Sequence, residues 1–228
     1  MQPTPCRPPV SLAPKPAPWL RDASFRTLAP TLEQRGFALG LLATCYVPVL
    51  LIWSGLIPFA CRFQVLAAVL LVLVALGVNR GFDRRELGFT LAHSRQALGW
   101  NLLFLAVGAV ALCALARSGW TMPRQSDYPL TAFLFYLLFL GPVQEVIFRG
   151  ILFAEMRKCG IVEGKLLVLI STCTFCFLHI IYNNPSVLLL TLVSGFVWGM
   201  LFLRWPSIWG VSLSHSLLGA LAMFLGIL

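Results

Sequence analysis

One segment of the chain combines polar and ionisable side chains with a long apolar run. Residues 141–150 read GPVQEVIFRG, and we take Glu145 as the single acidic residue in the interior of the apolar segments. A charged group at membrane depth costs at least about 2.5 kcal/mol on insertion scales and is usually retained for a function. Arg149 follows at the i+4 position, on the same helix face, where an ion pair can form. Glu145 is therefore the first candidate for chemistry.

Two histidines stand in later apolar segments, His179 behind Phe177 and His215 between two serines. One carboxylate and two imidazoles on three helices suit hydrolysis of an amide bond. The carboxylate can take a proton from water, one imidazole can pass that proton to the leaving amine, and the other can stabilise the oxyanion. Each residue also has a structural interpretation, Glu145 with Arg149 as a buried pair and the histidines as packing residues that bridge helices. Their conjunction in a chain with few intramembrane polar groups favours a site.

The elements that position these residues are apolar helices. Of 228 residues, 59% are apolar and 11% are charged, whereas about 25% are charged in a typical soluble domain. Runs of about 20 apolar residues indicate membrane spans, and the fold class is all-α, a polytopic membrane helical bundle. We expect seven spans, six or eight being compatible, at 37–58, 63–79, 98–116, 130–156, 164–182, 187–203 and 207–227. Pro142, three residues before Glu145, is expected to kink the fourth span.

The distribution of proline and basic residues predicts the domains and the topology. Residues 1–36 are rich in proline and arginine and predict a flexible cytoplasmic tail, with the transmembrane domain at 37–228. Thirteen Lys and Arg lie in the tail and in alternate connections, and three lie in the other connections. By the positive-inside rule the amino terminus is cytoplasmic. Lipid headgroups, rather than nucleic acid, are the expected partners of this basic surface. The short basic chain predicts an integral protein of a bacterial plasma membrane.

The seven cysteines and the 80–97 loop are not assigned chemistry. Cys173 and Cys176 have the C-x-x-C spacing but lie in an apolar helix without a βαβ pattern, so packing is favoured over redox or metal work. No disulfide is predicted. The loop mixes charges with aromatic residues and predicts either an interfacial helix or a charged loop along the cytoplasmic surface. His93 is expected to be solvated or to lie at the level of the lipid headgroups.

Three motifs resemble a known family. Residues 144–150, QEVIFRG, are similar to the E-E-x-x-F-R-G motif of the CAAX prenyl endopeptidase and bacteriocin-processing (CPBP) family of glutamic intramembrane proteases. Residues 175–179, FCFLH, resemble its second motif, F-x-x-x-H, and His215 begins a version of its third, H-x-x-x-N. Their order and spacing agree over about 130–228, the family-like core.

The resemblance implies an activity and a set of site residues. It implies an intramembrane endopeptidase that uses no cofactor or metal and acts on a protein or peptide substrate in the lipid bilayer, with carboxyl-terminal tail processing as one form. The catalytic residues it implies are Glu145, His179, His215, Gln144 and Arg149.

Two departures from the family pattern leave alternatives open. Gln144 stands where the family has the glutamate usually credited with activating water, and an amide cannot act as a base. Gly219 stands where the third motif often has an asparagine, so half of the oxyanion clamp is missing. A catalytically inactive membrane scaffold or immunity-type protein is therefore an alternative. A zinc-dependent membrane protease with Glu145, His179 and His215 as ligands is another, although H-E-x-x-H is absent.

Overall fold

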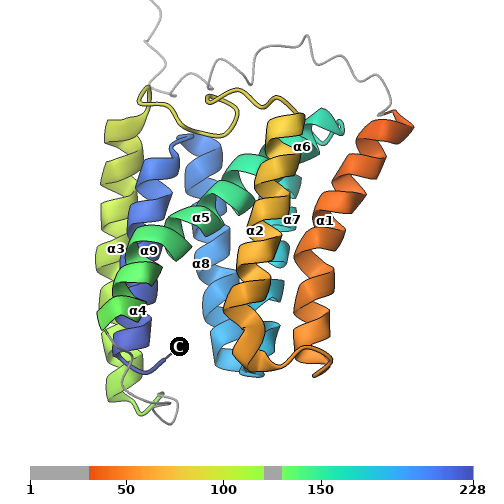
Figure 1. Cartoon of the computed structure of the whole chain (residues 1–228). Helices are drawn as coiled ribbons and strands as arrows, with labels where there is room; N and C mark the ends of the chain where they lie inside the picture. Colours follow the sequence, from red (N-terminus) through yellow and green to blue (C-terminus); the bar gives the residue numbers. More distant parts are fainter. Residues whose placement is uncertain (1–30, 121–129, 228) are drawn as a thin grey trace, which may run out of the picture.

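The computed structural model of the chain describes residues 31–120 and 130–227 (Figure 1). Within these residues all regular structure is helical. Six helical segments are long and apolar enough to cross a membrane, and a seventh apolar helix is shorter. This confirms the predicted polytopic helical bundle. The helices are α1 Leu32–Trp53, α2 Arg62–Asn79, α3 Ser94–Arg117, α4 Leu130–Phe135, α5 Gly141–Glu145, α6 Leu152–Lys158, α7 Gly164–Phe177, α8 Pro185–Arg204 and α9 Ile208–Phe224.

The first helix lies about one turn earlier than its apolar run predicts. It begins at Leu32, inside the segment expected to be tail, and ends at Trp53 rather than at residue 58. Thr31 caps it, because the threonine hydroxyl accepts from the Gln34 backbone N–H at 3.2 Å and the Gln34 side chain accepts from the Thr31 N–H at 2.9 Å. This reciprocal cap satisfies donors at the start of the helix. Residues 1–30 of the predicted tail lie outside the described residues.

The span that carries Glu145 is one continuous helical segment with two irregular turns. α4, α5 and α6 are joined by π-helical turns at Tyr136–Leu140 and Val146–Ile151. Pro142 is in the first turn of α5, directly after the first π turn. Because proline has no N–H to donate, a π turn at this point accommodates it within the span. In Figure 1 this segment runs obliquely across the bundle.

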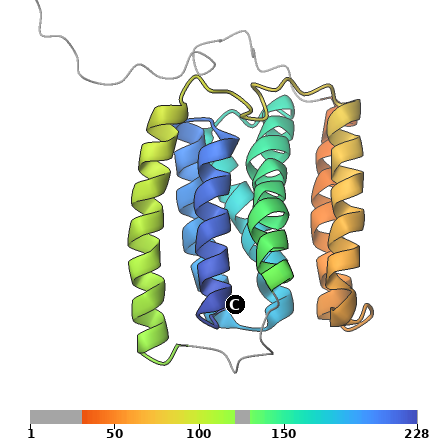
Figure 2. The ribbon, with the colours of Figure 1, turned by 60° about the vertical axis from the view of Figure 1, so that its left-hand side comes forward.

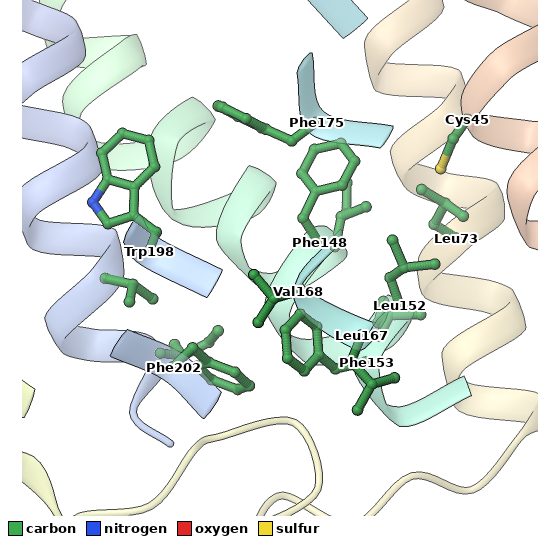
Figure 3. Close-up of a cluster of buried hydrophobic side chains, with 14 of the residues drawn as sticks. Cys45, Leu73, Phe148, Leu152, Phe153, Leu167, Val168, Phe175, Trp198 and Phe202 are labelled. Atoms are coloured by element: carbon green, nitrogen blue, oxygen red, sulfur yellow. The ribbon is translucent and has the colours of Figure 1, made fainter. Parts of the chain in front are cut away.

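The site helices lie in the centre of the bundle. α4–α6, α7, α8 and α9 lie between α3 on one side and the pair α1 and α2 on the other (Figures 1 and 2). In α7 and α8, 33% of the most apolar 18-residue stretch is buried inside the protein. The corresponding share is 6% in the span that contains α2 and 11% in α3. The outer helices therefore present most of their apolar side chains to lipid. Aromatic side chains fill the centre, where the Phe175 ring contacts both Phe148 and Trp198 (Figure 3), with centroids 5.5 Å and 6.0 Å away.

The connection between α2 and α3 crosses one end of the bundle. Its residues 80–93 form turns and loop rather than an interfacial helix. The Gly88 carbonyl accepts a hydrogen bond from the Ile208 N–H at 3.0 Å, and the Leu87 backbone covers Gly150. Both contacts tie the loop to the bundle. His93 is half-buried directly before α3 and does not contribute to the site described below.

The described chain starts and finishes at opposite ends of the bundle, which is consistent with an odd number of membrane crossings. α1 begins at the end of the bundle where α6 finishes, and α9 finishes at the opposite end (Figure 1). The cytoplasmic position of the amino terminus stays a prediction from the basic residues.

Candidate active site

A close approach of α5 and α9 brings the first and third motifs together. A Cβ placed on Gly141 would overlap the Ser216 hydroxyl, so glycine permits the two helices to touch. One turn further along α5, the Glu145 carboxylate faces His215, with 2.6 Å between Glu145 Oε1 and His215 Nδ1. Glu145 is 0% exposed and His215 is 2% exposed.

The predicted ion pair between Glu145 and Arg149 is present. Arg149 Nη1 donates to Glu145 Oε1 at 2.9 Å, and Nη2 donates to the Gly195 carbonyl of α8 at 2.9 Å. The guanidinium carbon lies 4.9 Å from the centroid of the Phe175 ring. Arg149 is therefore held by α7 and α8 as well as by its own helix. Glu145 Oε2 is buried and has no hydrogen-bond partner among the described residues.

The chemistry of the pair assigns the proton on His215. An ionised carboxylate only accepts hydrogen bonds, so Nδ1 of His215 is the donor to Glu145 and Nε2 is the acceptor of the neutral ring. Trp198 holds this ring in place, since the two rings stack with centroids 4.3 Å apart and 18° between their planes. The carboxylate, guanidinium and imidazole thus form one fixed, buried group.

His179 does not join this group. It lies in the 3₁₀ turn Leu178–Tyr182 that follows α7, and its Nδ1 is 2.9 Å from the Phe175 carbonyl oxygen. The Phe175 ring is near both histidines, with its centroid 4.9 Å from His179 and 5.3 Å from His215. The phenylalanine of the second motif therefore forms an aromatic wall shared by the two histidines.

Gln144 and His179 instead share a cavity. A cavity of about 80 Å³ lies between α1, α2, α5 and the 3₁₀ turn after α7, and both residues line it together with Tyr182 and Arg62. Glu145 is not among its lining residues. Gln144 is 6% exposed, and its side-chain oxygen has no partner among the described residues. The two neighbours of the first motif thus face different surroundings, as positions about 100° apart on a helix must.

The geometry argues against the zinc alternative. Nδ1 of His215 is taken by Glu145, and Nδ1 of His179 is taken by a backbone carbonyl. Over residues 31–120 and 130–227, no three His, Cys, Asp or Glu side chains are grouped closely enough to hold a metal ion.

A buried polar chain behind His215 was not predicted from the sequence. Trp198 Nε1 donates to Ser214 Oγ at 2.9 Å, and Ser214 Oγ donates to Asn101 Oδ1 at 2.7 Å. These bonds link α8, α9 and α3. Asn101 is 1% exposed. A lone asparagine inside an apolar span was the signal in the sequence that could have indicated it.

Glu145 is not the single buried acid, which corrects the expectation from the sequence. Glu155 of α6 is 1% exposed and accepts two hydrogen bonds from Arg80, each 2.9 Å long. The hydrogen bond with Glu155 raises the pKa of Arg80. Burial, together with the Glu155 carboxylate, raises the pKa of the Cys159 thiol to about 11. Glu155 lies in the last turn of its span, where a charge reaches the membrane surface easily, so the sequence pattern did not mark it.

The fold and the site define a class of protein, a helical integral membrane protein with a carboxylate, a guanidinium and an imidazole buried together in its core. Residues 126–221 match the family model described as type II CAAX prenyl endopeptidase Rce1-like. This region contains all three motifs, and over it the chain is similar to the CAAX protease family, as the motifs predicted. This similarity supports a CAAX-type intramembrane protease as the general class of function. No curated protein and no solved structure matches the chain.

Proposed function

We propose that the chain is a glutamic-type intramembrane endopeptidase that hydrolyses a peptide bond in a membrane-associated protein or peptide. One observation carries the proposal. The Glu145 carboxylate is fully buried, with Oε1 held by Arg149 and His215 and with Oε2 bound by no described residue. A fixed carboxylate with one uncommitted oxygen is suited to accept a proton from water.

Hydrolysis begins at the uncommitted oxygen of Glu145. Glu145 Oε2 takes a proton from water while the water oxygen bonds to the scissile carbonyl carbon. The tetrahedral intermediate then loses its C–N bond, and the proton on Glu145 goes to the leaving amine. Arg149 and His215 hold the carboxylate in one orientation throughout. His179, which lines the cavity, is the second imidazole. Its Nδ1–H faces the Phe175 carbonyl, so its Nε2 is placed here as a hydrogen-bond acceptor that orients the attacking water.

The cavity supports an apolar substrate. Most of its lining is aliphatic or aromatic, and its polar side chains include Gln144, His179 and Arg62. A peptide with an apolar or lipid-modified carboxyl-terminal segment fits such a surface, because burying apolar area away from water drives its binding. The basic residues on alternate connections support an orientation with the amino terminus in the cytoplasm, and we propose a bacterial plasma membrane as the location.

Cleavage by purified protein tests the proposal. Protein in detergent would be incubated with two sets of peptides, one with prenylated carboxyl-terminal tails and one with unmodified tails, and products would be identified by mass spectrometry. We expect Glu145→Gln and His215→Ala each to lower kcat by about 100-fold or more. Glu163→Gln, on an exposed glutamate, and His93→Ala are the matched controls and should cleave like the wild type. Wild-type cleavage that persists in both site variants would refute the mechanism.

A second function, that of an inactive scaffold, is favoured by one specific observation. Gln144, not Glu145, lines the cavity with His179, so no carboxylate is among the residues that line it. Under this function the native chain cleaves none of the peptides. Gln144→Glu would then place a carboxylate in the cavity and create activity. Cleavage by the native chain that Gln144→Glu fails to increase would speak for the enzyme.

A further inference from the structure

Tyr136 reaches from the first π turn to the helix that carries His215. A Cβ placed on Gly219 would overlap the Tyr136 hydroxyl oxygen and would lie 2.5 Å from Cε1 of the ring. Side chains do not pack at such separations, so only glycine at position 219 leaves room for the tyrosine. Gly219 follows His215 by about one turn of α9. The Tyr136 hydroxyl therefore occupies the space where a side chain at position 219 would stand.

The surroundings of Tyr136 leave its hydroxyl available to a ligand. Its ring meets the His215 ring edge to face, with centroids 6.3 Å apart and planes at 68°. The residue is half-buried, and among the described residues its hydroxyl makes no hydrogen bond. Tyrosine hydroxyls inside proteins usually find a hydrogen-bond partner. An uncommitted phenol beside the Glu145–His215 pair is a donor placed where a reacting carbonyl would have to lie.

We propose that Tyr136 is a catalytic residue whose hydroxyl donates a hydrogen bond to the carbonyl oxygen of the scissile peptide bond. It does so from the position that a side chain at residue 219 would otherwise fill, and it compensates for the asparagine that the third motif lacks here. The phenol keeps its proton through the reaction, and its hydrogen bond strengthens as negative charge develops on the carbonyl oxygen. This inference rests on the proposed protease function.

Removal of the hydroxyl alone is the first test. Tyr136→Phe keeps the ring against Gly219 and His215, so it should leave thermal unfolding and KM close to the wild-type values. Loss of one oxyanion donor lowers kcat by about 100-fold to 1,000-fold in other hydrolases, and we expect a loss of that order. Tyr46→Phe is the matched control, because its hydroxyl lies 3.2 Å from Thr174 Oγ1 and its ring packs on Phe177, away from Gly219.

A swap of side chains is the second test. Gly219→Asn alone should be poorly folded or inactive, since its Cβ overlaps Tyr136. Tyr136→Ala alone should fold and be nearly inactive. The double variant Tyr136→Ala/Gly219→Asn places an amide donor in the vacated space and should cleave at least about 10-fold faster than Tyr136→Ala, a recovery of about 1.4 kcal/mol in the barrier.

The outcomes separate this inference from the proposed function. A wild-type protein that cleaves no tail peptide overturns both. A wild-type protein that cleaves, with Tyr136→Phe at the same kcat, overturns the role of Tyr136 and leaves the protease function standing. A double variant that folds but stays as slow as Tyr136→Ala also overturns it.

Discussion

Replacement of Arg149 by methionine would measure how strongly the buried ion pair holds the bundle together. Arg149 and Glu145 are both 0% exposed, and the guanidinium also donates to the Gly195 carbonyl. Removing one partner of a buried ion pair costs about 3–5 kcal/mol, because the remaining charge is left uncompensated. The Gly195 carbonyl lies inside α8, and hydrogen bonds between membrane helices average about 0.6 kcal/mol, so its loss adds little. We expect Arg149→Met to lower the free energy of unfolding by about 3–5 kcal/mol.

The double variant Glu145→Gln/Arg149→Met separates lost charge from lost packing. It removes both charges while the glutamine oxygen can still accept from His215. If the uncompensated carboxylate is the source of the cost, the double variant should be more stable than Arg149→Met alone by about 2–4 kcal/mol. This recovery depends on charge pairing and not on the size of the side chain at position 149.

Equilibrium unfolding in mixed micelles of detergent and dodecyl sulfate, followed by tryptophan fluorescence, measures these differences. Arg204→Met is the matched control, since Arg204 lies in the last turn of α8 with its guanidinium carbon 5.5 Å from the Trp205 ring. It should change the free energy of unfolding by less than about 1 kcal/mol. If the double variant is no more stable than Arg149→Met, the uncompensated charge of Glu145 is not the cause of the lost stability, and the prediction is refuted.

Two further predictions concern the loop and the end of α6. Gly88 has φ 80°, and a Cβ there would lie 2.5 Å from a Phe202 ring carbon, so Gly88→Ala should cost about 1–3 kcal/mol in the same unfolding assay. Gly81→Ala, at φ 60° with open space around it, is the control, and equal losses would exclude the Phe202 contact as a cause. The pKa of the Cys159 thiol is raised to about 11, and the thiolate is the form that reacts with an alkylating reagent. In a variant with only this cysteine, the alkylation rate should therefore keep rising about tenfold per pH unit to near pH 10. An alkylation rate that levels off below about pH 9 would contradict the raised pKa. Glu155→Gln should shift the pH at which the rate levels off to a lower value.

The sequence alone determined the fold class and most of the spans. The fifth span agrees in both bounds, 164–182, with the helical segment Gly164–Tyr182. Burial of an apolar run of this length in a bilayer forces it to satisfy its own backbone, and that requirement is local in sequence. The start of α1 at Leu32 differed because a polar capping box, not apolarity, sets it.

Within the site, the sequence determined the ion pair and the tertiary structure decided the rest. Glu145 and Arg149 meet because i and i+4 are neighbours on any helix. The pairing of Glu145 with His215, the separate position of His179 and the contact of Tyr136 with Gly219 depend on how each helix is rotated and tilted against the others. The rotation and tilt of the helices depend on the π turns around α5 and on the glycines where helices touch. Both features have their effect through packing between segments that are distant in the sequence.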